Sequence, residues 1–264
     1  MADQTPVIAC IKWGIGYPTV YANTLFQAVR DLTSSPFRFV CITDDPVGLA
    51  EGIETRPIPH FALERKLWTR GMWPKFAICA DGMFEAGVPV LYLDLDVMVT
   101  GDLTPMIAHI REHGGLHAPQ DWPLTHERWF PKLFHEERIL HGAVIGFVAG
   151  EQNHLYDMVK DRGPDLIKEY RNDQFFFQKH AANRQYFPEP WVLSFKKSLA
   201  WHVPTCFFLE ASRPPKDCLI VSFHGTPNPQ DLIQRPFKRW GSNEKFGFFP
   251  VKWVKSYWER YSGE

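Results

Sequence analysis

The sequence predicts an α/β fold in which helices cover both faces of a mainly parallel central sheet. Two observations lead to this prediction. Continuous apolar runs, which are typical of strands buried on both faces, alternate along the chain with segments of helical periodicity. The 264 residues are 45% hydrophobic, so the chain is long and apolar enough to bury a core on each side of such a sheet.

The N-terminal part supplies the first strands. Val7–Ile11 is apolar throughout, and after a glycine-containing turn a helical pattern begins at Tyr17. Phe37–Ile42 and Ile53–Ile58 are the next strand candidates, because turn residues bound each of them. These segments predict strand, helix, strand and strand in that order.

The middle of the chain contains the clearest strand. A helix is expected over Pro74–Met83, since proline is favoured in the first turn of a helix. It leads into Val88–Leu93, the strongest buried-strand pattern in the sequence. The later elements, in chain order, are a strand over Gly142–Ala149, helices over about Asn153–Arg162 and Asp173–Ala182, and a strand over Cys218–Phe223.

The charge balance and the cysteines exclude several classes of protein. With 29 Lys and Arg against 30 Asp and Glu, the formal net charge is -1, so no overall positive field exists to bind nucleic acid. No signal-peptide core is visible, and no apolar run approaches the roughly 20 residues that span a bilayer. Five scattered cysteines without a C-x-x-C pair are typical of reduced core thiols. We therefore expect a cytoplasmic protein with no nucleic-acid partner and no membrane span.

Two carboxylates, Asp94 and Asp96, follow the strand Val88–Leu93 directly. In an open α/β sheet the ligand site lies beyond the carboxyl ends of the strands. Acidic side chains two residues apart on an extended segment point the same way, and a hard divalent cation between them would relieve their repulsion. Such cations usually bind one or two protein carboxylates and the phosphates of a substrate, so we expect Mn²⁺ or Mg²⁺ and a phosphate-containing substrate. A pair of solvated turn residues is the alternative.

The histidines divide into two groups. His224 follows an apolar run and is the candidate for a third metal ligand, since neutral imidazole suits Mn²⁺; a structural histidine is the alternative. His109, His113 and His117 are interpreted as a solvated face, because two glycines break their helical spacing and no H-E-x-x-H motif is present.

The segment from Tyr92 to Leu103, which contains the D-x-D, resembles the metal-binding segment of GT-A glycosyltransferases related to glycogenin and to lipopolysaccharide galactosyltransferases. Further matching segments follow in the family's order over about residues 7 to 230: Thr43-Asp44-Asp45, Gly142–Phe147, Asn172-Asp173-Gln174 and Phe223-His224-Gly225. The resemblance implies a GT-A fold, that of nucleotide-diphospho-sugar transferases, in a single domain over residues 1–264. It also implies a nucleotide-binding half over about 1–100 and an acceptor half with a C-terminal tail over about 101–264.

The resemblance assigns roles to individual residues. It implies a metal site at Asp94, Asp96 and His224, and a catalytic sugar face at Asp173 and Gln174. The residues implied at the nucleotide and its diphosphate are Ile11, Lys12, Trp13, Tyr17, Asp44, Asp45, Lys75, Gly225 and Asn228. From the residues alone, Asp173 could equally cap the helix that it opens, and Asp44-Asp45 could form a simple turn.

The chain departs from the family's pattern at two places. Phe175 follows Gln174 where the family usually has Asp, and Asn228-Pro229 stand where it usually has Lys-Pro. The family's lysine reaches the diphosphate, so another cation is needed here. Lys12, Lys75 and Arg235 are the candidates.

We therefore expect a metal-dependent, hexosyltransferase-like enzyme that moves a sugar from a nucleotide sugar, with UDP as the expected nucleotide, to a glycan or small-molecule acceptor with retention. A phosphatase of the haloacid dehalogenase type is one alternative, because its nucleophile loop is also a D-x-D after an apolar strand. The position of the motif behind a complete strand-helix-strand unit argues against it. A non-catalytic protein that binds sugar nucleotides is the other alternative.

The C-terminal stretch Phe237–Tyr261 is both aromatic and basic. We expect a tail helix and a loop that pack these aromatic side chains on the main body, where long basic side chains cover them. A role in acceptor binding or at a membrane surface is the alternative.

Overall fold

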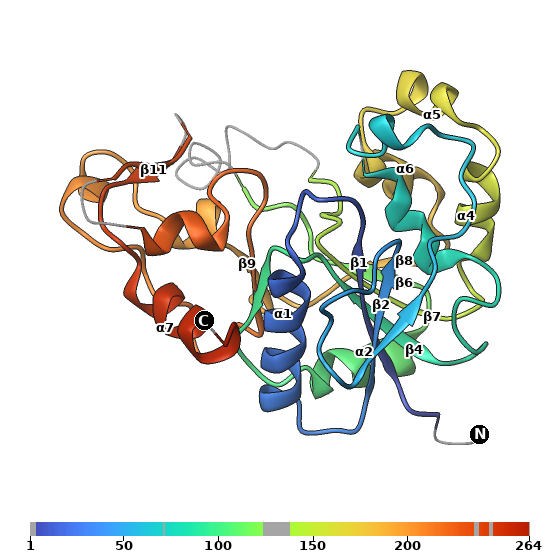
Figure 1. Ribbon diagram of the computed structural model, residues 1–264, viewed down its shortest axis with the longest axis horizontal. Coiled ribbons are helices and arrows are strands. Elements are labelled where there is room, and N and C mark those ends of the chain that lie inside the picture. Colours follow the sequence, from blue (N-terminus) through green and yellow to red (C-terminus); the bar gives the residue numbers. More distant parts are fainter. Residues whose placement is uncertain (1–3, 71, 124–137, 235–237, 243–244, 264) are drawn as a thin grey trace.

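The computed structural model describes residues 4–70, 72–123, 138–234, 238–242 and 245–263. Across these residues the main sheet has seven strands in the order β3-β2-β1-β4-β7-β6-β8 (Figure 1). The strands are β1 (Val7–Lys12), β2 (Arg38–Thr43), β3 (Ile53–Arg56), β4 (Pro89–Leu93), β6 (Leu116–Ala118), β7 (Val144–Val148) and β8 (Arg184–Tyr186). Strands β3, β2, β1 and β4 run parallel to one another, whereas β7 is antiparallel to β4 and β6. The mainly parallel α/β sheet predicted from the sequence is confirmed.

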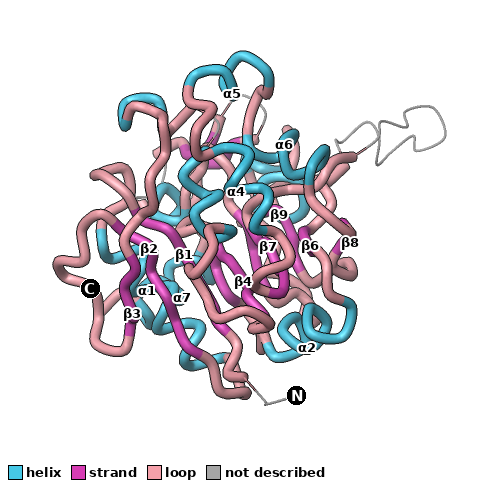
Figure 2. The backbone as a smooth tube through the Cα atoms, turned by 90° about the vertical axis from the view of Figure 1, so that its right-hand side faces the viewer, coloured by secondary structure: helices cyan, strands magenta, loops and turns pink. Residues whose placement is uncertain are grey.

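Side chains of β1 point alternately into two cores on opposite faces of the sheet. Ile8 and Cys10 belong to one core, whereas Val7, Ala9 and Ile11 belong to the other. The first core includes α1 (Thr19–Leu32), α2 (Thr104–His113) and α7 (Lys252–Tyr261), and the second includes α4 (Asn153–Val159), α5 (Pro164–Glu169) and α6 (Asp173–His180). Figure 2 shows the strands between α4 and α6 on one side and α2 on the other. Because both faces are covered, β1 and β4 are buried along their whole length and need continuously apolar sequences.

A smaller sheet begins where β4 ends. After the D-x-D the chain enters β5 (Val97–Val99), which pairs with β10 (Ile220–Ser222), and β10 pairs in turn with β9 (Val192–Ser194). A third core, which includes Met98 and Val221, packs on this sheet. Shorter helical turns connect these elements: η1 (Arg65–Leu67), η2 (Trp73–Cys79), the π-helix η3 (Phe195–Leu199), η4 (Thr205–Phe207) and η5 (Pro229–Ile233).

The C-terminal residues pack on α1. The rings of Trp258 and Tyr21 lie 5.0 Å apart, and the Tyr257 hydroxyl accepts a hydrogen bond of 3.2 Å from the Val99 backbone N–H. In Figure 1 the orange and red segments, including the hairpin β11 (Trp240–Gly241) and β12 (Phe246–Gly247), lie together at one end of the molecule. The predicted packing of tail aromatics on the body is confirmed for α7. Among the described residues, no helix has the length and apolar character needed to cross a membrane.

Two expectations about local structure are wrong. The segment Pro74–Met83 is not one α-helix: the 3₁₀-helix η2 covers Trp73–Cys79 and stops before Ala80, where the backbone is extended. All residues of η2 are buried, so tertiary packing rather than helical propensity determines its shape. His117 does not share a solvated face with His109 and His113, because it is fully buried in β6. Positive φ angles at Gly114 and Gly115 turn the chain back after α2 and bring the His117 ring within 4.9 Å of that of His109.

Candidate active site

A cavity of about 430 Å³ lies at the carboxyl ends of β1 and β4, where ligands bind in open α/β sheets. Most of the residues that line it are apolar or aromatic, and both carboxylates of the D-x-D belong to the lining. The lining residues are Ile11, Trp13, Gly14, Ile15, Gly16, Tyr17, Arg65, Thr69, Met72, Tyr92, Asp94, Leu95 and Asp96. Five residues implied from the sequence, namely Ile11, Trp13, Tyr17, Asp94 and Asp96, therefore share one cavity.

Each carboxylate of the D-x-D is held by a tyrosine. The Tyr92 hydroxyl donates a hydrogen bond of 2.6 Å to Asp94 Oδ1, and the Tyr17 hydroxyl donates one of 2.9 Å to Asp96 Oδ2. The backbone is held as well, because the Asp94 N–H donates to the Ala143 carbonyl at 2.9 Å. The two side chains thus have defined positions in the lining of the cavity.

The two carboxylates repel each other in a desolvated place. Burial, and after it the negative charge of Asp94, raises the pKa of Asp96 from its ordinary value of 3.8 to about 7. Burial and the neighbouring Asp96 also raise the pKa of the Tyr17 hydroxyl, which therefore stays protonated as a donor. A cation between the carboxylates would favour the ionised form of Asp96.

Lys75 joins the D-x-D to α6. Its Nζ lies 3.1 Å from an Asp94 carboxylate oxygen and 3.2 Å from Asp173 Oδ2, and it donates a hydrogen bond of 2.8 Å to the Gly142 carbonyl. Burial alone would lower the Lys75 pKa, but the charges of Asp173 and Asp94 outweigh that effect and raise it. The lysine is therefore a buried cation shared by two carboxylates, and it does not line the cavity.

Asp173 is not the cap of α6. Asn172 caps this helix, since its Oδ1 accepts a hydrogen bond of 3.2 Å from the Phe175 N–H, whereas Asp173 is buried against Lys75. The interpretation of Asp173 as a helix cap is therefore wrong. Burial raises the pKa of Asp173, with Lys75 acting in the opposite direction.

Gly142, which begins the family-like segment Gly142–Phe147, also belongs to this cluster. A Cβ at Gly142 would lie 3.1 Å from Asp173 Oδ2, 3.3 Å from Lys75 Nζ and 3.5 Å from Gln174 Cγ, so any side chain there would displace charged neighbours. Gln174, which is half-buried, therefore lies beside Gly142 together with its sequence neighbour Asp173.

The loop after β2 holds the rim of the cavity. The Asp44 carboxylate accepts from the Gly14 N–H at 3.3 Å and forms an ion pair of 2.6 Å with Arg65, which lines the cavity. Asp45 instead closes a turn by accepting from the Val47 N–H at 3.0 Å. Lys12 is buried and is not part of the lining. Arg65, which was not expected from the sequence, is thus the cationic residue in the described lining of the cavity.

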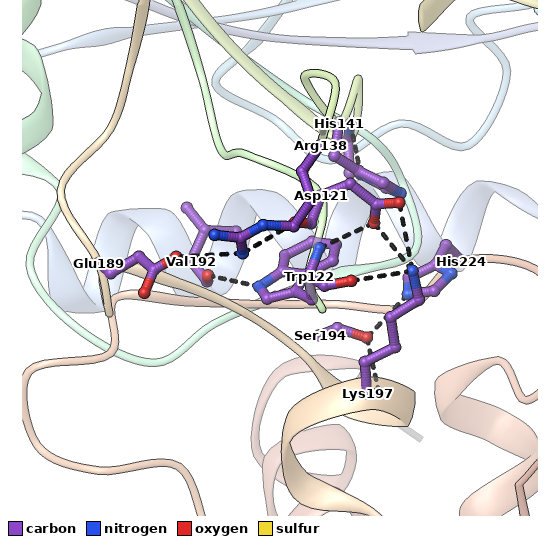
Figure 3. Close-up of polar contacts among 10 residues, drawn as sticks. Asp121, Trp122, Arg138, His141, Glu189, Val192, Ser194, Lys197 and His224 are labelled. Atoms are coloured by element: carbon purple, nitrogen blue, oxygen red, sulfur yellow. Dashed lines mark hydrogen bonds and ion pairs between the residues drawn. The ribbon is translucent and has the colours of Figure 1, made fainter. Parts of the chain in front are cut away.

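His224 lies in a separate cluster (Figure 3). Its Nε2 is 2.7 Å from Ser194 Oγ, and its ring stacks on Trp122 with centroids 5.6 Å apart and an interplanar angle of 3°. Burial, with the positive charges of Lys196 and Lys197, lowers the pKa of His224 to about 4. The neutral His224 ring therefore hydrogen-bonds with Ser194 and stacks on Trp122.

The other members of this cluster were not expected from the sequence. Figure 3 shows Lys197 directed at Asp121, with Nζ–Oδ distances of 3.1 and 3.2 Å, and the His141 ring lies 5.0 Å from that of His224. Within the described ranges, no group of three or more His, Cys, Asp or Glu side chains is arranged to hold a metal ion. The structure thus brings Asp94 and Asp96 together without assembling a three-ligand set that includes His224.

Gly225 and Asn228 also lie outside the lining of the cavity. Gly225 is exposed, and the Asn228 N–H donates to Asp231 Oδ2 at 2.8 Å at the start of η5. Arg235 falls outside the described residues. None of these observations assigns a phosphate contact to them.

Comparisons with known proteins identify the fold. No protein-family model matches the chain, and no curated protein sequence matches it. A structure of the galactosyltransferase LgtC in complex with donor and acceptor sugar analogues is similar, with a TM-score of 0.59, 14% identity and coverage of 97% of this chain and 96% of LgtC. The glycosyltransferase GlyE of Streptococcus pneumoniae TIGR4 is similar over 98% of this chain but only 62% of its own, with a TM-score of 0.55 and 13% identity.

Mouse xyloside xylosyltransferase 1 gives a TM-score of 0.50 at 11% identity, over 84% of this chain and 98% of its own. A further similar structure is an active-site glutamine-to-glutamate mutant of LgtC, with a TM-score of 0.54 at 14% identity. At these identities the likeness concerns the arrangement of the backbone. The chain therefore has the GT-A fold that these glycosyltransferases share.

Proposed function

We propose that this protein is a glycosyltransferase that transfers a sugar from a nucleotide sugar, with UDP as the favoured nucleotide, to a glycan or small-molecule acceptor. The observation that carries the proposal is the position of Asp94 and Asp96, which line a cavity of about 430 Å³ at the carboxyl edge of a GT-A sheet. The apolar and aromatic lining suits a nucleoside, and the carboxylates suit a cation bound to a diphosphate.

The carboxylate pair fits a hard divalent cation. Both donors are oxygen atoms, and the pKa of Asp96 is raised by burial and then by the negative charge of Asp94, which a cation would compensate. Mn²⁺ and Mg²⁺ usually bind one or two carboxylates and complete their coordination with substrate phosphates, so two protein ligands are sufficient. Held by Asp94 and Asp96, such an ion would neutralise charge on the leaving diphosphate.

Arg65 is well situated to contact the diphosphate in place of the family's lysine. Its guanidinium lies 5.2 Å from the Trp68 ring centroid and is paired with Asp44, so it is oriented before a ligand binds. Arginine recognises phosphate oxygens through two parallel hydrogen bonds. Lys75, in contrast, is surrounded by Asp94, Asp173 and a carbonyl, and it positions those groups.

Asp173 and Gln174 are proposed to face the transferred sugar. In glycosyl transfer the bond from the anomeric carbon to the diphosphate oxygen breaks, a bond to an acceptor oxygen forms, and the acceptor hydroxyl releases its proton. Positive charge develops on the sugar ring during this exchange. A carboxylate held in a desolvated place by Lys75 is a fixed negative charge that would stabilise that state. Retention of configuration is part of the proposal.

A screen of nucleotide sugars tests the proposal. Purified protein is incubated with each donor in Mn²⁺ or in chelator, and the release of nucleoside diphosphate is measured. Metal-dependent release from one donor supports the transferase. Release of inorganic phosphate from phosphate esters would support the phosphatase alternative, and donor binding without turnover in the presence of an acceptor library would support a binding protein.

A further inference from the structure

An exposed apolar patch lies far along the chain from the D-x-D. We define it as the side chains of Trp201, Val203, Phe207, Phe208 and Leu209. Phe208 is 77% exposed, Val203 58% and Leu209 52%. These five are most of the large apolar side chains that are exposed in the described residues, and they fall within nine consecutive positions. Clustered exposure of this kind marks an interaction surface, whereas single exposed apolar residues are common.

A hydrogen bond and ring stacking hold the segment that carries the patch in place. Trp201 Nε1 donates a hydrogen bond of 3.0 Å to the Glu210 carbonyl, so the two ends of the segment are tied together. The Phe207 ring stacks on Phe248, with centroids 5.9 Å apart and an interplanar angle of 16°, and it also contacts Phe246. Because Phe207 anchors the segment, its neighbour Phe208 projects into solvent instead of folding back.

A groove of about 680 Å³ continues the patch toward α7. It combines apolar walls with two lysines, and its lining residues are Phe208, Glu210, Ile233, Gln234, Phe249, Pro250, Lys252 and Lys255. Both lysines are exposed. Lys255 forms an ion pair of 3.4 Å with Glu259 at the surface, and such a pair is weak. The surface is therefore an apolar centre bordered by two lysines and by Glu210, whose carboxylate accepts a hydrogen bond of 2.5 Å from the Lys252 backbone N–H.

The charge of this part of the chain is opposite to that of the rest. Residues 196–264 contain eleven Lys and Arg against six Asp and Glu, whereas residues 1–195 contain 18 against 24. In Figure 1 the described segments of this C-terminal part, in orange and red, lie together toward one end of the molecule. Lys252 and Lys255 line the groove together with the exposed Phe208, and a combination of cationic and apolar side chains complements an anionic surface with an apolar interior.

We propose that this patch docks the protein on the surface of an anionic lipid bilayer. Phe208 and Leu209 enter the boundary between headgroups and acyl chains, while Lys252 and Lys255 lie against the anionic headgroups. A second copy of the chain fits less well, because two cationic faces would repel each other. The proposal concerns attachment alone and does not depend on the reaction assigned to the cavity.

Vesicle flotation tests this docking. The protein is mixed with vesicles of phosphatidylcholine alone or of phosphatidylcholine with phosphatidylglycerol, and the bound fraction is measured at low and high salt. We expect binding to the anionic vesicles only, and weaker binding at high salt. The double variants Phe208→Ser with Leu209→Ser and Lys252→Gln with Lys255→Gln should each lower the partition coefficient by about tenfold or more.

Val47→Ser is the matched control, since Val47 is 76% exposed but belongs to the loop after β2. It should bind like the parent, and thermal unfolding checks that every variant is folded. Equal binding of the parent to both vesicle types would overturn the proposal, as would unchanged binding of the apolar variant. Sedimentation velocity tests the alternative that a second copy of the chain binds the patch. If the parent forms a dimer that the apolar variant abolishes, and the parent does not bind vesicles, the patch serves self-association instead.

Discussion

Lys75 Nζ and Asp173 Oδ2 lie 3.2 Å apart in the interior of the protein, where their side chains are 4% and 5% exposed. Removing one partner of a buried pair leaves an uncompensated charge, which is far more costly than removing both. The pair also fixes the distance between η2 and α6, and through Asp94 it connects both elements to the end of β4.

Lys75→Met should destabilise the fold by about 3–5 kcal/mol, because the carboxylates of Asp173 and Asp94 lose their shared cation. The double variant Lys75→Met with Asp173→Asn should recover a large part of that loss. Urea unfolding of the parent, both single variants and the double variant measures the coupling free energy. Additive losses would show that the pair does not act as a unit.

Asp173→Asn should lower kcat by about 100-fold or more while KM for the donor changes little, since a fixed charge near the developing positive charge is lost. The helix itself should survive, because Asn172 supplies the cap. The matched control is Asn172→Asp, which retains a good cap and should keep nearly all turnover. Turnover of Asp173→Asn at the parental rate would remove Asp173 from the catalytic group.

Asp94→Ala and Asp96→Ala should each abolish transfer and remove the effect of Mn²⁺ on donor affinity. Both side chains line the cavity, and in Asp94→Ala the buried Lys75 keeps its ion pair with Asp173, so the main loss is of a ligand site. Isothermal calorimetry with a nucleoside diphosphate, in Mn²⁺ and in chelator, gives the comparison. The exposed Asp161 supplies the control variant Asp161→Ala. Parental metal dependence in both site variants would show that the metal binds elsewhere.

Arg65→Gln should weaken the binding of nucleoside diphosphates by about tenfold, as expected when a charge-assisted hydrogen bond is replaced by a neutral one. The neighbouring Lys66→Gln removes the same charge from a side chain that is 74% exposed and pairs with Glu64, outside the cavity lining. Affinity for the diphosphate relative to the unphosphorylated nucleoside separates the two variants. If both variants weaken diphosphate binding equally and only slightly, Arg65 contributes no more than general electrostatic attraction.

The pKa of Asp96 predicts how stability depends on pH. In the folded protein this pKa is about 7, above its ordinary 3.8, so between these values the native state binds more protons than the unfolded state. The metal-free protein should therefore lose stability as pH rises from about 4 to about 7, and the loss should be smaller in Asp96→Asn. In Mn²⁺ the trend should weaken, because the ion favours the carboxylate. Melting temperatures across this range, in chelator and in Mn²⁺, provide the measurement.

Local pattern was sufficient for the elements that are buried on both faces. Strands β1, β2 and β4 were predicted because their sequences are continuously apolar, and the D-x-D was found because it follows such a strand. Strands β5, β6, β8 and β9 were missed, since each has three residues and is defined by its pairing with distant segments.

In the candidate active site, too, local pattern located some residues, whereas contacts with distant segments determine their roles. Asn172 and Asp173 are both good capping residues, so only the position of Lys75 distinguishes their roles. His224 was correctly placed after a strand, but the direction of its ring depends on Ser194 and Trp122, which lie far away in the sequence. Arg65 belongs to a segment without a periodic pattern, and its pairing with Asp44 is visible only in three dimensions.

The three residues Asp94, Leu95 and Asp96 join one sheet to another, and this junction bears on the entropy of ligand binding. The Asp94 N–H is bonded to the Ala143 carbonyl, and the Asp96 carbonyl accepts from the Phe223 N–H at 3.3 Å, so both ends of the junction are tied to different sheets. Tyr92 and Tyr17 restrain the two carboxylates in addition. A cation or diphosphate that binds here meets groups already ordered by folding, so little conformational freedom is lost on binding and more of the interaction energy becomes affinity.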